Sequence, residues 1–322
     1  MKKIRFGKIN KVIIFGGNEV TLEMCKFLNK KKINNIVFTT RKQSIEEIPS
    51  NKMSFSQNLK INKINFKIVK NLNNNLLKKY INKNTLGLSN ACRWIFKEKQ
   101  IKLFKGKLLN IHFSNLPNNR GAGGLSWNIM MNNFNSGSTI HLINNKIDYG
   151  YSLINKSFKF PKKIRASLYD MQNYSYNFQK KIIFQFLKKI FKNEAFNLNK
   201  INQTKANSCY WPKLDTKKNG WINWNWPAND IVNFVNAFSN PYSGAKTLLD
   251  KKIIKLRKAK VANSSFTFHP FQYGLIYKSI SSKVYVACKN GGIILNKKDF
   301  TPFNKIIGKR LKTSLTILNR AF

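Results

Sequence analysis

Three side chains in the middle of the chain have the types and the spacing that acyl transfer needs. Asn110 and His112 lie two positions apart in the segment KLLNIHFS, so both leave the same face of a strand. Asp148 follows 36 residues after His112, in the turn KIDYG. A histidine that exchanges a proton near pH 7, a carboxylate that supports it and an amide that stabilises an oxyanion form a plausible set for this chemistry.

The small numbers of histidines and acidic residues in the chain strengthen this interpretation. Asparagine is abundant, so an asparagine close to a histidine arises easily by chance, and a lone histidine is more often structural. The whole chain, however, has only three histidines and 12 acidic residues. One of each lies at a turn-rich strand end, which favours a site.

The elements that must position these side chains begin at the N-terminus. The run KVIIF (11–15) predicts a short strand, Gly16-Gly17-Asn18 a tight turn, and the apolar spacing after it a helix. NIVFTT (35–40) is the next predicted strand, so a β-α-β unit and a parallel sheet are expected. The turn lacks the G-x-G-x-x-G spacing of a dinucleotide site. We interpret its residues as the types that a tight turn requires; the alternative is that its backbone amides and the helix N-terminus contact an anionic acceptor group.

The strand that carries Asn110 and His112 runs directly into a loop marked by Pro117 and Gly121. This predicts that the pair lies at the carboxyl end of a parallel strand, where open α/β sheets bind their ligands. Further strands are expected at 88–96, 138–143 and 149–154.

Chain length and composition predict two domains. Residues 1–195 are expected to form an open α/β domain. A polar, unpatterned stretch over 195–208 predicts a linker, and 209–322 a smaller domain with a helix at 229–238 and a β-hairpin turn near Asn290-Gly291-Gly292.

The formal net charge of +47 allows two interpretations. Such a field attracts polyanions at low salt and would suit nucleic-acid binding. Only eight of the 59 basic residues are arginine, however, and Lys, Asn and Ile crowd together throughout the chain. Because base and bidentate phosphate recognition favour arginine, compositional drift is the preferred explanation.

Four cysteines, without any Cys-x-x-Cys pair, indicate neither a zinc site nor a disulfide framework. The basic start lacks the apolar core and cleavage site of a signal peptide, and no stretch approaches the roughly 20 apolar residues that cross a bilayer. A cytoplasmic protein without membrane contact is therefore expected.

The order and spacing of several motifs resemble the folate-dependent formyltransferase family. The family pattern is Asn-x-His-x-Ser-x-Leu-Pro, then Arg-Gly, then Asp-x-Gly. This chain has Asn110 to Pro117, Arg120-Gly121 and Asp148-Tyr-Gly150, and GWINW (220–224), NAFSNPYSGAKT (236–247) and GKRLKT (308–313) extend the likeness. The resemblance implies an open Rossmann-like, mostly parallel sheet followed by a smaller oligonucleotide-binding-like β domain.

The resemblance also implies a donor, N10-formyltetrahydrofolate, and no metal. Trp94, Ile95 and Phe96 match the segment that holds the pterin, although a simple buried strand is the alternative there. Ile143, Asn144, Asn145, Lys146 and Ile147, which lead to Asp148, match the loop that closes over it. Asn110 and His112 would then stabilise the oxyanion, and His112 with Asp148 would relay protons.

The acceptor can be initiator tRNA, as in methionyl-tRNA formyltransferases, or a small amine such as a nucleotide-linked amino sugar. The tRNA enzymes resemble one another in a loop rich in Arg and Gly after the second strand. This chain has TTRKQSIEEIPSNKM there, with Glu46 and Glu47 and no glycine. Carboxylates repel phosphate, so the small amine is preferred.

Overall fold

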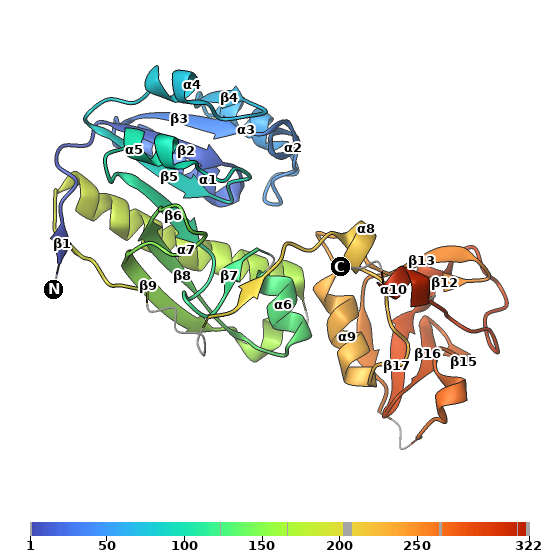
Figure 1. Cartoon of the computed structure of the whole chain (residues 1–322). Coiled ribbons are helices and arrows are strands. Elements are labelled where there is room, and N and C mark those ends of the chain that lie inside the picture. The colour runs from blue at the N-terminus through green and yellow to red at the C-terminus, as the bar shows by residue number, and fades with distance from the viewer. Residues whose placement is uncertain are drawn as a thin grey trace. The chain divides into compact units, whose positions relative to one another are not determined.

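The computed structural model describes residues 2–122, 124–165, 167–201, 208–263, 266–313 and 315–319. They fold into two compact units, each with its own hydrophobic core (Figure 1). The first unit comprises Met1–Gly121, Ser136–Phe158 and Tyr174–Tyr210, and the second comprises Ala122–Asn135, Lys159–Asn173 and Trp211–Phe322.

A seven-stranded sheet with the order β4-β3-β2-β5-β6-β8-β9 organises the first unit. Neighbouring strands from β4 to β6 run parallel, and β8 runs antiparallel to β6. The predicted open, mostly parallel α/β fold is therefore confirmed. The strands are β2 (Lys11–Gly16), β3 (Asn34–Thr39), β4 (Asn65–Ile68), β5 (Thr85–Asn90), β6 (Leu108–His112), β8 (Asn135–Leu142) and β9 (Ser152–Lys159).

Helices and loops cover both faces of this sheet, which explains why β2 is apolar from Val12 to Phe15. Val12 and Ile14 point into one hydrophobic cluster, whereas Ile13 and Phe15 point into another. The first cluster includes side chains of α1 and α7, and the second receives Leu77 from α4. The helices are α1 (Glu19–Lys30), α2 (Arg41–Ser44), α3 (Phe55–Ile61), α4 (Asn74–Lys78), α5 (Glu98–Leu103) and α7 (Leu168–Phe191).

The turn between β2 and α1 is built for close packing. The φ of Gly16 is +118°, and a Cβ there would lie 2.0 Å from the carbonyl oxygen of Asn90. A Cβ on Gly17 would meet the ring of Phe55. The side chain of Asn18 caps α1 by accepting from the N–H of Thr21. These contacts support the interpretation that Gly16, Gly17 and Asn18 serve the geometry of the turn and the start of α1.

Two parts of the first unit differ from the sequence prediction. The strand expected over 88–96 ends at Asn90, because Ala91 has a φ of +52° and the chain leaves the sheet there. The 24-residue helix α7 was not predicted as an element, since its apolar side chains are interrupted by Tyr, Asn and Lys.

A four-stranded antiparallel sheet with the order β14-β17-β16-β15 and the hairpin β12-β13 form the core of the second unit. The predicted hairpin turn is confirmed, because Asn290 and Gly291 both have positive φ between β16 and β17. The strands of the second unit are β12 (Ala245–Leu249), β13 (Lys252–Leu256), β14 (Ala259–Val261), β15 (Ile276–Ile280), β16 (Lys283–Cys288) and β17 (Gly291–Asn296). Its helices are α6 (Gly124–Met130), α8 (Thr216–Asn219), α9 (Ala228–Ala237) and α10 (Leu315–Asn319), with 3₁₀ turns at Lys162–Ile164, Pro270–Gln272 and Lys297–Phe300.

Four short strands complete the fold: β1 (Lys3–Ile4), β7 (Arg120–Gly121), β10 (Phe196–Asn197) and β11 (Tyr210–Trp211). Strand β10, which pairs with β1, lies inside the stretch predicted as a linker, and residues 202–207 of that stretch lie outside the described residues. The boundaries 1–195 and 209–322 stay a prediction.

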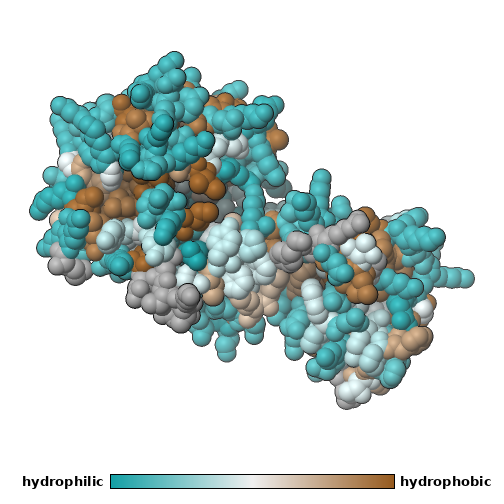
Figure 2. Space-filling view, in the orientation of Figure 1, coloured by the Kyte–Doolittle hydropathy of each residue, from teal (hydrophilic) through white to brown (hydrophobic). Residues whose placement is uncertain are grey.

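Hydrophilic residues lie across the visible face of each unit, with hydrophobic patches between them (Figure 2). Within the described ranges, no helix is long and apolar enough to cross a membrane.

Candidate active site

Strands β6 and β8 and the loop after β8 bring four polar side chains together in the first unit. Asn110 and His112 end β6, as predicted, and His141 lies opposite Asn110 in the ladder with β8. Asp148 reaches the same place from the loop that follows. The side chains of His112, His141 and Asp148 are 12%, 3% and 9% exposed, so this cluster is largely screened from water.

The carboxylate of Asp148 is the centre of the cluster. Its Oδ2 accepts a hydrogen bond from the backbone N–H of Gly121 at 2.9 Å, and its Oδ1 accepts one from Nδ2 of Asn110 at 3.3 Å. Nδ1 of His112 and Nε2 of His141 lie 3.6 and 3.7 Å from Oδ1. Burial by itself raises the pKa of Asp148, but His112, His141 and the Gly121 N–H together lower it to about 2. Asp148 is therefore a carboxylate at neutral pH.

Backbone geometry explains the glycines of the two short motifs. Asp148 has a φ of +53°, a conformation that aspartate and asparagine tolerate better than most residues. A Cβ on Gly150 would lie 1.6 Å from the carbonyl oxygen of Leu142, so only glycine fits where the loop turns back over β8. Gly121, whose N–H donates to Asp148, has a φ of +90°.

Each histidine has one nitrogen at a backbone carbonyl and the other near Asp148. Nε2 of His112 lies 2.7 Å from the carbonyl oxygen of Asn119, and Nδ1 of His141 lies 2.9 Å from that of Leu142. A carbonyl only accepts, so these two nitrogens carry hydrogens. The remaining nitrogen of each ring faces the carboxylate of Asp148.

The amide of Asn110 is fully engaged in this arrangement. Its Oδ1 accepts from the hydroxyl of Ser89 at 2.8 Å, which fixes the orientation of the amide. Its Nδ2 donates towards both Asp148 and Nε2 of His141, at 3.3 and 3.2 Å. A developing oxyanion would have to replace or share one of these two hydrogen bonds.

His141 was missed in the sequence. It belongs to STIHLI, where alternation alone places it on one face of a strand, but only the antiparallel register with β6 sets it opposite Asn110. The signal that could have identified it is scarcity, because two of the three histidines of the chain lie in this cluster. The third, His269, caps a 3₁₀ turn of the second unit.

The three residues expected to hold a pterin have different environments. Nε1 of Trp94 donates to the carbonyl of Lys70 at 3.0 Å, and Trp94 is half-buried. Ile95 is 75% exposed, so the alternative of a buried strand is wrong for it. Phe96 is a core residue whose ring packs edge-on against Phe15, with centroids 5.0 Å apart.

The loop that leads to Asp148 packs on the same hydrophobic cluster. Ile143 donates its N–H to the carbonyl of Leu108 at 3.0 Å and contacts the cluster that contains Phe96 and Trp94. Asn144, Asn145, Lys146 and Ile147 are exposed. Ile143 is thus the residue of this loop that shares a hydrophobic cluster with Trp94 and Phe96.

Comparison with known proteins identifies the family. The family described as Formyl transferase matches residues 10–185, more than half of the chain, and Formyl transferase, C-terminal domain, matches residues 215–301. The chain belongs to the formyl transferase family. The match over residues 10–185 contains Asn110, His112, His141 and Asp148.

Two curated relatives carry different names. The bifunctional polymyxin resistance protein ArnA of Wigglesworthia glossinidia brevipalpis is 34% identical over 230 residues, which cover 68% of this chain and 33% of the relative. A methionyl-tRNA formyltransferase of Clostridium novyi (strain NT) is 27% identical over 207 residues, which cover 64% of this chain and 63% of the relative. The matched part of the chain thus spans less than two thirds of each relative.

Two solved structures share the formyl transferase fold along most of the chain. The sugar 3N-formyl transferase WlaRD, solved with dTDP and 5-N-formyl-THF, has a TM-score of 0.68 at 22% identity over 90% of this chain and 98% of that one. An N-formyltransferase from Helicobacter canadensis, solved with folinic acid and dTDP-3-aminofucose, has a TM-score of 0.67 at 21% identity over 89% and 98%.

Proposed function

We propose that this protein transfers a formyl group from N10-formyltetrahydrofolate to the primary amine of a nucleotide-linked amino sugar. The observation that carries the proposal is the buried carboxylate of Asp148, which Gly121, Asn110 and two histidines surround within a formyl transferase domain. This arrangement keeps a negative charge beside two groups that can hold or move a proton.

The proposed reaction begins when the neutral amine attacks the formyl carbon. A nitrogen–carbon bond forms, and the carbonyl oxygen becomes an oxyanion that Nδ2 of Asn110 and a protonated His112 stabilise. Collapse of the intermediate breaks the bond between the formyl carbon and N10. The proton lost by the amine passes through His112 or an ordered water to N10, and Asp148 stays ionised throughout.

The apolar surface near the cluster suits a folate ring. Ile95 and Ile147 are 75% and 45% exposed although they are hydrophobic, and Trp94, next to Ile95 in the sequence, is half-buried. A flat heterocycle would cover such side chains favourably. We therefore propose that Trp94 to Phe96 and Ile143 to Ile147 bind the donor.

The segment after β3 supports a small acceptor. Glu46 forms an ion pair with Arg93 at 2.7 Å, which neutralises a guanidinium that could otherwise meet phosphate. The side chain of Gln43 donates to the backbone carbonyls of Gly17 and Ala91, which ties the segment to the sheet edge. Both solved structures described above hold dTDP or a dTDP-linked amino sugar, which supports the same class of acceptor.

Initiator tRNA is the second candidate acceptor. Relatives named methionyl-tRNA formyltransferase, including the one from Clostridium novyi, and the net charge of +47 favour it. A polyanion would bind this chain at low salt on either proposal, so binding alone does not discriminate between them.

A formyl-transfer assay at about physiological ionic strength tests both. The protein is incubated with N10-formyltetrahydrofolate and, separately, a panel of nucleotide-linked amino sugars and charged initiator tRNA, with His112→Ala as the inactive control. We expect formylated sugar and little formylated tRNA. Efficient tRNA formylation with no sugar accepted would overturn the acceptor assignment, and no transfer to any amine would overturn the activity.

A further inference from the structure

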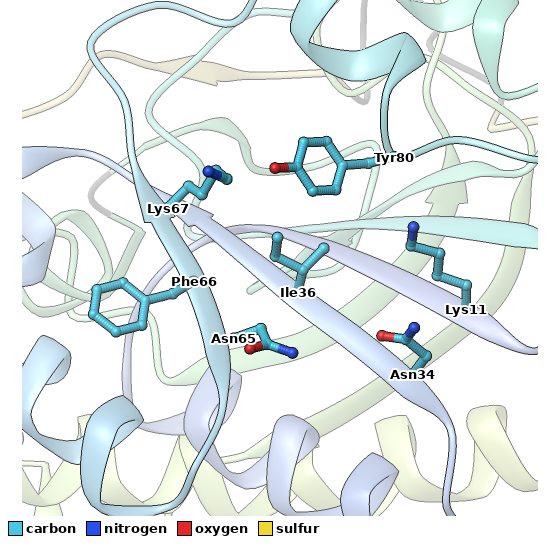
Figure 3. A pocket seen from close by; sticks show the side chains of 7 residues that line it. All are labelled: Lys11, Asn34, Ile36, Asn65, Phe66, Lys67 and Tyr80. Atoms are coloured by element: carbon cyan, nitrogen blue, oxygen red, sulfur yellow. The ribbon is translucent and has the colours of Figure 1, made fainter.

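A pocket lies at the opposite edge of the large sheet from the candidate active site. It is open to solvent, has a volume of about 430 Å³ and is lined by the side chains that Figure 3 labels. Lys11, Asn34 and Asn65 are the first residues of β2, β3 and β4, so the pocket lies at the amino ends of these parallel strands. Asn110 and His112 lie instead at the carboxyl end of β6. The pocket is therefore distinct from the candidate active site.

Two lysines converge on one aromatic ring in this pocket. Nζ of Lys11 lies 5.5 Å and Nζ of Lys67 lies 6.0 Å from the ring centroid of Tyr80. The ring is held from behind by Phe38, edge-on at 5.3 Å. None of the seven lining residues is acidic. Two ammonium groups that share a ring without a carboxylate in the lining repel each other and favour an anion.

The rest of the lining suits a flat polar ring. Ile36, which is almost completely buried, forms an apolar floor. In Figure 3, Lys67 and Tyr80 lie above Ile36 in the view, and the amides of Asn34 and Asn65 lie below it. An amide offers both a donor and an acceptor, the combination that the edge of a nucleobase requires.

The volume admits a ligand larger than a simple ion. At about 430 Å³ it is far larger than the roughly 10–15 Å³ that one water molecule needs, and it lies in the usual range of small-molecule sites. A free phosphate would contact the lysines but fill only a small part of this volume.

We propose that this pocket binds a mononucleotide. Its phosphate would lie between Lys11 and Lys67 at the ring of Tyr80, and its base would lie over Ile36 with its edge towards Asn34 and Asn65. The assignment is independent of the acceptor of the formyl group, because it concerns the opposite edge of the sheet.

Nucleotide titration followed at Ile36 tests the proposal. In protein labelled with ¹³C at isoleucine methyl groups, the Ile36 signal is assigned with Ile36→Val, and UMP, AMP, uridine and inorganic phosphate are titrated separately at about 150 mM salt. We expect UMP or AMP to shift this signal saturably, and uridine or phosphate to do so only at concentrations at least about 10-fold higher.

Matched variants distinguish nucleotide binding in this pocket from non-specific attraction to the positive charge of the protein. Lys11→Gln/Lys67→Gln and Tyr80→Leu should each weaken the nucleotide response at Ile36 by at least about 10-fold. Lys181→Gln/Lys188→Gln, which removes the same charge from the exposed face of α7, should leave it unchanged. An equal loss in this control, an equal response to phosphate alone, or no response at Ile36 would overturn the proposal. Formyl transfer by the pocket variants, measured in parallel, reports separately on the proposed activity.

Discussion

At the scale of single residues, His112 and Asp148 are expected to act as one unit. His112→Ala and Asp148→Asn should each lower kcat for formyl transfer by at least about 100-fold, since both would act on one proton relay. Asparagine tolerates the positive φ of position 148, so Asp148→Asn should keep the fold. Steady-state kinetics, with circular dichroism to verify folding, measures this.

The double variant sharpens the prediction. Residues that act together are not additive, so His112→Ala/Asp148→Asn should be little slower than the slower single variant. If the fold-loss in kcat of the double variant equalled the product of the two single losses, the residues would act independently. Near-normal turnover by either single variant would mean that the substituted residue is not catalytic.

Asp148 should also make stability depend on acid pH. Burial raises its pKa, but the two histidines and the Gly121 N–H lower it to about 2, below the ordinary value of 3.8. A lowered pKa in the folded state gives stability that is complete above the unfolded value and is lost as the pH falls through the folded value. The difference in unfolding free energy between the wild type and Asp148→Asn should therefore shrink by about 2 kcal/mol between pH 5 and pH 2.

Urea unfolding at a series of pH values measures this difference. Asp230→Asn, at an exposed position in the first turn of α9, is the control and should show a smaller dependence on pH. A difference for Asp148→Asn that stays constant down to pH 2 would mean that the histidines do not stabilise the carboxylate.

At the scale of elements, the return of the loop after β8 depends on Gly150. Gly150→Ala would place a Cβ 1.6 Å from the carbonyl oxygen of Leu142, so the loop must move and carry Asp148 with it. A displacement of about 1 Å at reacting groups can cost about 100-fold, so we expect a loss of that size in kcat/KM.

The melting temperature of Gly150→Ala shows whether its loss of kcat/KM comes from a displaced loop or from unfolding of the protein. Gly124→Ala, where a Cβ would meet nothing within 4 Å, is the matched glycine control and should leave the melting temperature nearly unchanged. If Gly150→Ala kept normal kcat/KM, the loop would not position Asp148 as proposed.

The sequence predicted the elements whose patterns are local. Alternation placed Asn110 and His112 on one face of β6, and the apolar run and Gly-Gly-Asn turn placed β2 and α1. The place of His141 depends on the long-range pairing of β8 with β6, and the contact of Asn119 with His112 depends on the conformation of the loop after β6, and no local pattern specifies either. The environments of Trp94 to Phe96 were not predictable either, because positive φ at Ala91 takes that segment out of the sheet.

At the scale of the whole molecule, most of the few acidic residues lie where a helix dipole or a basic side chain favours a negative charge. Four lie in the first turn of an α-helix: Glu19, Glu98, Asp170 and Asp230. Glu23, Glu46, Glu194 and Asp250 form ion pairs with basic side chains. This distribution agrees with drift towards lysine that has spared the carboxylates with a local role.

The dependence of the reaction on salt should follow from this interpretation. A nucleotide-linked amine brings at most two or three phosphate charges, so the logarithm of kcat/KM should fall only shallowly with the logarithm of salt concentration. A tRNA acceptor with six to ten phosphate contacts would lose about 10³- to 10⁵-fold in affinity between 50 and 200 mM. Kinetics across that range, with sodium chloride varied alone, measures the slope, and a steep loss with an amino-sugar nucleotide would contradict the drift interpretation.

The carbonyl of Asn119 also affects how much of the donor is lost to hydrolysis. It lies 2.7 Å from Nε2 of His112, and the hydroxyl of Ser114 donates to it at the same distance. Because Nε2–H of His112 donates to that carbonyl, this nitrogen is not free to take a proton from water, so under the proposed function a bound formyl donor should hydrolyse slowly when no acceptor is present. Donor breakdown without an acceptor should therefore be far slower than transfer. Ser114→Ala, which loosens this protective contact, should raise the ratio of hydrolysis to transfer, and an unchanged ratio would show that the donor is conserved by other means.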